Sequence, residues 1–168
     1  MSTRTFPRRS LLAALAAGAL LAVSFTPSVQ AYDETSHSEV NVDATGVALK
    51  GYDPVSYFKA GGPLLGSPKY SAKHEGATYH FASAANKAAF EKDPAHFAPQ
   101  FGGYCAMGVA LNHKLDVDPA LWRVVDGKLY LNVHKGAQQR WLEDTQGNIT
   151  QARANWTTIR GKAETELQ

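Results

Sequence analysis

Apolar and polar residues alternate in two stretches of the chain, and each stretch predicts a β-hairpin. The first, KYSAKHEGATYHFAS, turns at Glu75-Gly76. Its second half places Tyr79 and Phe81 on one face and His80 on the other, because successive side chains of a strand point to opposite faces. The second, LWRVVDGKLYLNV, turns at Asp126-Gly127, a pair that favours a tight two-residue turn.

Capping residues and apolar spacing predict helices around the two hairpins. Asp53-Pro54 starts a short helix, and Ser83 is the N-cap of the alanine-rich helix AANKAAFEKD. YCAMGVAL, after Gly102-Gly103, predicts a further short helix. The stretch from 135 to 161 predicts two helices that break near Gly147, with Asn148 as the cap of the second. The large apolar residues of this stretch are expected to pack inward: Trp141, Ile149, Trp156 and Ile159.

Together these elements predict a single α+β domain, a small module of β-hairpins with helices packed on one side. We expect the domain to cover residues 40–160 and to be followed by a short tail over 161–168. Residues 32–39 are polar and poor in apolar side chains, which predicts a flexible lead-in. The sequence shows no internal repeat.

The first 31 residues have the layout of a cleavable signal peptide. Arginines precede an apolar run from Leu11 to Phe25, and the small-residue sequence VQA ends at Ala31. The run is shorter than the roughly 20 residues that a membrane-spanning helix needs. Arg8-Arg9 also fits a twin-arginine signal, although Pro7 stands where such signals carry Ser or Thr, so both export routes stay open. We therefore expect a periplasmic or otherwise exported protein with no stable membrane insertion after cleavage.

Removal of the signal changes the charge balance. The chain has 17 basic and 15 acidic residues, and three of the basic ones precede residue 32, so the mature chain carries 17 − 3 − 15 = −1. This near-neutral chain has no cluster of basic and aromatic residues, and it therefore does not indicate a nucleic-acid partner. The 137 residues after position 31 (168 − 31) suffice for one hydrophobic core.

The only cysteine, Cys105, is the first candidate for chemistry. An exported protein usually pairs its cysteines or has none. A lone thiol can be a metal ligand, a redox centre or a nucleophile, or it can be a small buried apolar side chain. Gly102-Gly103 can present backbone amides that favour the thiolate and so lower its pKa. Met107 adds a second soft sulfur of the kind that Cu(I) prefers.

Histidines supply further candidate metal ligands, of which we take His80 and His113 together with Cys105 and Met107. His74 and His80 flank the first hairpin turn, where they could face each other as half of a metal site or be two solvated residues. No H-x-x-x-H, C-x-x-C or H-E-x-x-H spacing occurs in the chain.

Enzyme signatures are few. The chain has no G-x-S-x-G elbow and no phosphate-binding glycine loop. A thiol hydrolase would need a base and an orienting group near Cys105, for which His113 and Asp116 can be nominated. Aromatic residues near Tyr104, with Gly102 and Gly103, could instead border a cleft for a small organic ligand.

Three stretches of the chain resemble exported proteins of the YHS-domain family: KGYDPVSYF, GATYHFASAANKAAFEKDPAHFAPQFGGYCA and DPALWRVVDGKLYLN. The resemblance implies a small hairpin-plus-helix module associated with metal handling. Metal-type members carry cysteines in the pattern FCS-x-x-C, whereas this chain reads FASAAN. Ala82 and Asn86 therefore stand where those thiols would be, and the usual thiolate site of the family is missing.

From these observations we expect an exported, non-enzymatic binding module. A transition metal, copper first, is the expected ligand, and a metal donor or acceptor protein is the expected partner. Binding of a small organic ligand or a protein at an aromatic cleft is the second expectation. A thiol-dependent enzyme or redox protein that uses Cys105 is the third.

Overall fold

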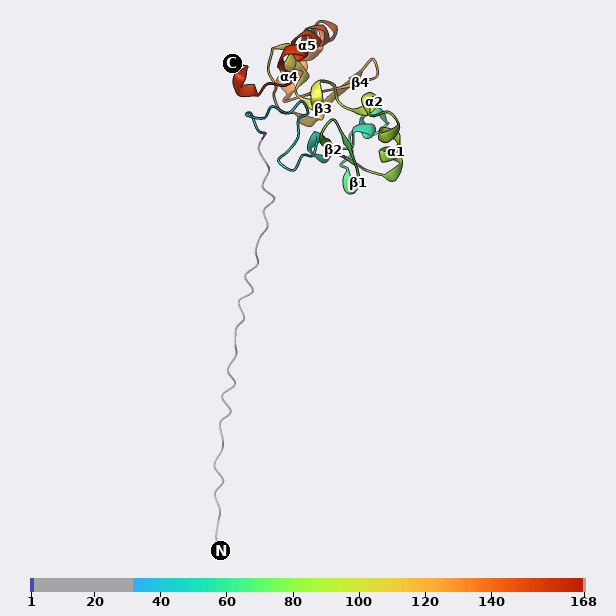
Figure 1. Ribbon diagram of the computed structural model, residues 1–168. Helices are drawn as coiled ribbons and strands as arrows, with labels where there is room; N and C mark the ends of the chain where they lie inside the picture. The colour runs from blue at the N-terminus through green and yellow to red at the C-terminus, as the bar shows by residue number, and fades with distance from the viewer. Residues whose placement is uncertain (2–31, 168) are drawn as a thin grey trace.

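The computed structural model describes Met1 and residues 32–167 (Figure 1). The prediction of a signal peptide and of cleavage after Ala31 therefore concerns residues outside the described range. The described chain forms one small α+β domain with two antiparallel hairpins, as predicted. No helix among the described residues is long and apolar enough to cross a membrane.

The first half of the domain is a hairpin preceded by short 3₁₀ turns and followed by two helices. The 3₁₀ turns η1 (Leu49–Gly51) and η2 (Pro54–Phe58) lead into β1 (Ser67–His74) and β2 (Ala77–Phe81). The helices α1 (Ala84–Lys92) and α2 (Pro94–Phe97) follow. Buried and partly exposed positions alternate along β2, which confirms that Tyr79 and Phe81 face the core and His80 the other side.

The second half has the same order of elements. The 3₁₀ turn η3 (Gln100–Gly103) and helix α3 (Ala106–Ala110) lead into β3 (Asp118–Val125) and β4 (Lys128–Asn132). The helices α4 (Lys135–Glu143) and α5 (Thr145–Ile159) follow, and a last turn, η4 (Glu164–Glu166), ends the chain. The two hairpins are separate two-stranded sheets in different parts of the domain (Figure 1).

Matching helix caps show that the two halves are versions of one structural unit. Ser83 caps α1 and His134 caps α4, 51 positions later. Asp93 caps α2 and Asp144 caps α5, again 51 positions later, and the two aspartates have nearly the same dihedral angles (φ −148°, ψ 74° and φ −144°, ψ 74°). The irregular register also recurs at this interval, since it falls between Ser67 and Ser71 in β1 and between Asp118 and Trp122 in β3.

The turns before each hairpin match as well, at an interval of 52 positions. Three successive residues with positive φ, Leu49–Gly51, correspond to Phe101–Gly103. Asp53 caps η2 and Cys105 caps α3. Their backbone amides donate to equivalent leucine carbonyls, Asp53 to Leu64 and Cys105 to Leu115, both at 2.9 Å.

The expectation of no internal repeat is therefore wrong. The repeat is carried by cap positions and backbone angles, and the side chains that fill equivalent positions differ in chemistry. A cap needs only an acceptor atom aimed at the first-turn amides, so serine and histidine, or aspartate and cysteine, can do the same structural work. Such differences in side-chain chemistry conceal the structural repeat in the sequence.

The break between the last two helices is also displaced from its predicted place. The helix break lies at Asp144, whose carboxylate accepts a hydrogen bond from the Gly147 amide at 3.0 Å. Asn148 is inside α5 and is not its cap. A side chain at position 147 would place its Cβ 2.1 Å from the Asp144 carboxylate, so this glycine belongs to the cap and not to a break. Trp141, Ile149 and Ile159 are buried, as predicted.

The two described ends of the chain are joined through Lys114, a fully buried lysine. Its ammonium donates to the carbonyls of Ser38, Arg160 and Lys162 at 2.6–3.0 Å and lies 4.7 Å from the centre of the Tyr104 ring. Residues 32–39, expected as a lead-in, also contact the C-terminal segment, since the Thr165 amide donates to the Glu34 carbonyl. Beyond residue 160, Ala163 and Glu164 are buried.

Candidate functional site

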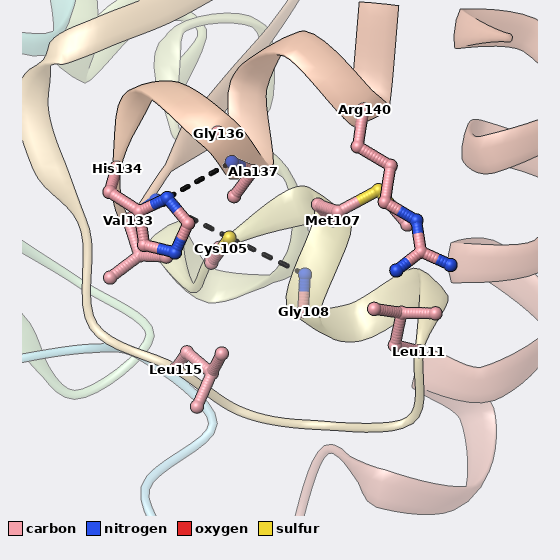
Figure 2. A pocket seen from close by; sticks show the side chains of 10 residues that line it. All are labelled: Cys105, Met107, Gly108, Leu111, Leu115, Val133, His134, Gly136, Ala137 and Arg140. Atoms are coloured by element: carbon pink, nitrogen blue, oxygen red, sulfur yellow. Dashed lines mark hydrogen bonds between the residues drawn. The ribbon is translucent and has the colours of Figure 1, made fainter. Parts of the chain in front are cut away.

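A pocket of about 240 Å³ lies beside Cys105 in the second unit (Figure 2). Its wall comes from α3, from the connection after α3, and from the start of α4. The lining is almost entirely apolar. The lining residues are Cys105, Met107, Gly108, Leu111, Leu115, Val133, His134, Gly136, Ala137 and Arg140.

The Cys105 sulfur has a structural task at the bottom of this pocket. It caps α3 by accepting a hydrogen bond from the Gly108 amide at 3.4 Å. It also accepts one from the Val133 amide at 3.3 Å, which ties α3 to the end of β4. Its own S–H faces the side-chain oxygen of Asn132 at 3.7 Å.

These surroundings keep the thiol protonated. Burial raises the pKa of Cys105 above its ordinary value, and hydrogen bonds from the backbone amides of Gly108, Val133 and Met107 offset only part of this effect. The amides that we expected to lower the thiol pKa come from α3 and Val133, not from Gly102-Gly103, and burial outweighs them. The direction is opposite to that of an activated nucleophile.

Met107 and His134 line the same pocket from different elements. Met107 is 4% exposed. The His134 Nδ1 accepts a hydrogen bond from the Ala137 amide at 3.0 Å. An accepting Nδ1 carries no proton, so the neutral ring carries its proton on Nε2. His134 can therefore offer an N–H donor to the pocket but cannot bind a metal through Nε2 while it caps α4.

The other two expected metal ligands lie away from this pocket. His80 is on β2 in the first unit, with its ring against Gly51. His113 follows α3, and its Nδ1 lies 2.7 Å from the Glu164 carboxylate. The structure thus brings Cys105 and Met107 together and leaves His80 and His113 elsewhere. No group of three or more His, Cys, Asp or Glu side chains within the described residues is placed to hold a metal ion.

Of the two alternatives for His74 and His80, the cross-strand pair does not form. The two-residue turn pairs His74 with Ala77 and places His80 opposite Ser71. His74 lies on the core face, where its ring packs 5.8 Å from that of Phe90, whereas His80 points to the other face. The two rings therefore occupy opposite faces of the hairpin.

The residues expected to border an aromatic cleft have packing roles. Tyr104 is 2% exposed, and its hydroxyl donates to the Ser38 carbonyl at 2.8 Å. Its ring packs against Tyr32 and Trp156. Gly102 allows close passage of the N-terminal segment, because a Cβ there would lie 1.9 Å from the Glu39 carbonyl oxygen. Gly103 has a φ of +81° and packs against Pro99.

In the first unit, a buried polar network stands where the second unit has its pocket. Asp53, which corresponds to Cys105, accepts hydrogen bonds from the amides of Val55 and Ala82 and from the side-chain amide of Asn86. Asn86 in turn accepts one from the Lys59 ammonium. Ala82 and Asn86 are the positions at which the resemblance would require thiols, and Asn86 is committed to this network. The family's metal site therefore does not fit these residues.

In the second unit, apolar side chains replace each member of that network. Cys105 stands for Asp53, Leu111 for Lys59 and Ala137 for Asn86, while the Val133 amide donates to the sulfur as the Ala82 amide donates to the carboxylate. The pocket thus lies where the second unit lacks the side-chain amide and the ammonium group that the first unit holds within the same frame of backbone hydrogen bonds.

At other equivalent positions, the side chain of the second unit is sometimes smaller and sometimes larger than that of the first. Gly108 replaces Ser56 and Gly136 replaces Ala85, which adds space. Larger residues stand at four other positions of the lining: Met107 for Val55, Val133 for Ala82, His134 for Ser83 and Arg140 for Ala89. Leu115 has a leucine, Leu64, as its counterpart. The second unit is therefore a re-shaped version of the first, and not one that has merely lost packing atoms.

Three of the residues that shape the pocket were not predicted from the sequence: Leu111, His134 and Arg140. The overlooked repeat was the signal that could have found them. Aligning LKGYD at 49–53 with FGGYC at 101–105 matches Cys105 with Asp53, and aligning ATYHFAS at 77–83 with KLYLNVH at 128–134 matches His134 with Ser83. Continuing the two alignments without gaps matches Leu111 with Lys59 and Arg140 with Ala89.

Comparison with known proteins gives no relative for this chain: no family model, no curated protein and no solved structure matches it.

Proposed function

We propose that this chain is a non-enzymatic binding module and that its ligand lies in the pocket beside Cys105. The observation that carries the proposal is the difference between the two units. The same backbone frame is closed by the Asp53–Asn86–Lys59 network in one unit and holds an apolar pocket in the other. A mostly apolar pocket with a few polar groups at its edge is a common setting for a small ligand.

A binding role fits the chemistry of Cys105 better than an enzymatic one. The thiol is fully buried, its pKa is raised by burial, and its contacts are backbone amides and Asn132. A thiol nucleophile needs the thiolate and an adjacent base. Within the described residues, no carboxylate or imidazole is hydrogen-bonded to this sulfur.

Benzene is a suitable first probe of the pocket. Apolar cavities of roughly 150 Å³ bind benzene, and the pocket here is about 240 Å³. We expect saturable NMR shifts of the Gly108 and Val133 amides on addition of benzene. Ala137→Asn, which restores the first-unit residue, should abolish them, and so should Gly108→Ala, whose Cβ would lie 3.3 Å from Leu115.

The matched control is Ala154→Asn on the exposed face of α5, which should leave benzene binding unchanged. Circular dichroism of each variant checks that it is folded. If the wild-type protein shows no saturable shifts at these amides, the proposal of a ligand-binding pocket is wrong.

Cu(I) is a second candidate ligand, because the sulfurs of Cys105 and Met107 line one pocket (Figure 2). Soft thiolate and thioether ligands suit this ion. An anaerobic titration of Cu(I) against a competing chelator should give one-to-one binding that Cys105→Ser and Met107→Leu each weaken. His134→Ser, which keeps a capping side chain, should leave it unchanged. Binding that survives Cys105→Ser would exclude this site.

We further propose that the module acts outside the cytoplasm, on the strength of the N-terminal sequence pattern. The resemblance to exported YHS-domain proteins supports the same compartment. If the ligand is Cu(I), the partner would be a protein that donates or accepts the metal. Cellular fractionation of the full chain with and without residues 2–31 tests the export proposal.

A further inference from the structure

We propose that the ligand of this pocket is a small monocarboxylic acid with an apolar body and that Arg140 binds its carboxylate. This inference rests on the proposed binding function and adds the chemical class of the ligand. Three features of the pocket support it: a cation at its mouth, a helix start in its wall, and a volume that suits a ring-sized apolar group.

The cation is Arg140, on the second turn of α4. Its side chain reaches along the pocket toward Leu111, opposite His134 (Figure 2). The residue is exposed, so its stem lines the apolar space while its guanidinium reaches solvent at the mouth. The guanidinium makes no ion pair with any described carboxylate. In the first unit, Ala89 takes this position, so the cation is present only where the pocket is.

The charges around the mouth favour an anion. Helix α4 carries Lys135 and Arg140 against one carboxylate, Glu143, and the Asp144 carboxylate at its end accepts a hydrogen bond from the Gly147 amide of α5. In the connection after α3, the Asp116 carboxylate is already paired with Lys50, and the Glu164 carboxylate of η4 is paired with His113 and accepts a hydrogen bond from the Lys114 amide. Both carboxylates therefore already have partners, and the charged side chain that lines the pocket, Arg140, is positive.

The start of α4 adds to this preference. Gly136 and Ala137, both in the first turn of this nine-residue helix, line the pocket. The amino end of a helix carries a partial positive charge that stabilises nearby anions. His134 contributes a donor, because its capping bond leaves the ring proton on Nε2.

The size and polarity of the pocket restrict the rest of the ligand. About 240 Å³ exceeds the roughly 150 Å³ of a cavity that holds benzene, which leaves room for a ring or a branched chain and one small group. One guanidinium binds one carboxylate through two parallel hydrogen bonds. The single lining cation and the apolar wall suit a singly charged acid and do not suit a phosphate or a sugar.

The test compares three probes of similar size: sodium benzoate, benzyl alcohol and benzene. Isothermal titration with the full mature chain at neutral pH should show benzoate binding at least tenfold more tightly than benzyl alcohol. Arg140→Gln should reduce benzoate affinity about tenfold or more and leave benzyl alcohol affinity unchanged. Arg140→Lys should fall between, because lysine keeps the charge and loses the paired geometry.

Arg153→Gln is the matched control, since it removes the same charge from an exposed position on α5 and should change neither affinity. If benzoate and benzyl alcohol bind equally, or if Arg140→Gln weakens both alike, the carboxylate inference is wrong and the binding function stands. If neither probe nor benzene binds the wild-type protein, both the inference and the proposed function are wrong.

Discussion

At the scale of the residue, Cys105 is a thiol whose sulfur accepts hydrogen bonds from backbone amides. It replaces the carboxylate of Asp53 as the cap of a short helix and as the acceptor for the amide that follows the hairpin. A protonated sulfur can do this without the charge that a buried carboxylate brings. The neutral thiol is therefore compatible with an apolar pocket at the same position, whereas Asp53 needs the amide of Asn86 beside it.

A pH dependence of stability follows from this residue. The pKa of Cys105 is raised above the ordinary 9.0 by burial, so above about pH 9 the folded state holds a proton that the unfolded state has lost. Stability contributed by the thiol is thus complete below pH 9 and declines as pH rises toward the folded-state pKa. The difference in unfolding free energy between wild type and Cys105→Ser should shrink above pH 9 by up to about 1.4 kcal/mol per pH unit.

Urea unfolding at a series of pH values from 7 to 10.5 measures this difference. Subtracting the variant removes the contribution of the buried tyrosines, whose pKa values burial also raises. A difference that stays constant across the series would mean that the thiol titrates normally in the folded protein.

At the scale of the element, the two units pack the same elements together with different side chains. In each unit, a short helix meets the end of the hairpin and the helix that follows it. In the first unit this junction is filled by a carboxylate, a side-chain amide and an ammonium group, and in the second unit by a thiol and apolar side chains. If the junctions are equivalent, groups taken from the first unit should cooperate when placed together in the second.

We therefore predict favourable coupling between Cys105→Asp and Ala137→Asn. Cys105→Asp alone buries a carboxylate with too few donors, which should lower stability by about 3 kcal/mol. Adding Ala137→Asn supplies the donor that Asn86 gives Asp53 and should recover about 1–2 kcal/mol beyond additivity. A double-mutant cycle of urea unfolding measures the coupling, and additive losses would argue against equivalent junctions.

Local chemistry explains which elements could be predicted. The turn pairs Glu75-Gly76 and Asp126-Gly127 fix the two hairpins. The Ser83 cap fixes the start of α1. Each of these signals affects only the few residues next to it in the sequence, so it can be recognised from the sequence alone. The break between α4 and α5 was misplaced because a glycine that serves an aspartate cap was taken for a helix breaker. The pocket depends on α3 meeting α4, which are separated by a whole hairpin, so no local pattern indicates it.

At the scale of the whole molecule, Lys114 holds the chain ends together. Its ammonium is satisfied by three carbonyls from the two ends and by the face of Tyr104. The buried Glu164 and the segment around Glu34 join the same region. Stability of the domain thus depends on residues near both limits of the described chain.

Replacing this lysine should therefore be strongly destabilising. Lys114→Met keeps most of the side-chain volume but leaves three buried carbonyls without a donor, and we expect a loss of about 3 kcal/mol or more. The control Lys92→Met, at an exposed helix end, should change stability by less than about 0.5 kcal/mol. Thermal and urea unfolding of both variants test this, and similar values for the two would refute the role given to Lys114.

The Lys114 contacts also set the order in which the chain can fold. Its acceptors lie 76 residues before it and 46 and 48 residues after it, so the last of these bonds spans most of the remaining chain. Contacts of such high sequence separation form late and slow the folding reaction. The two hairpin units can each form early, but the domain is closed only once the segment around Arg160 and Lys162 has reached Lys114.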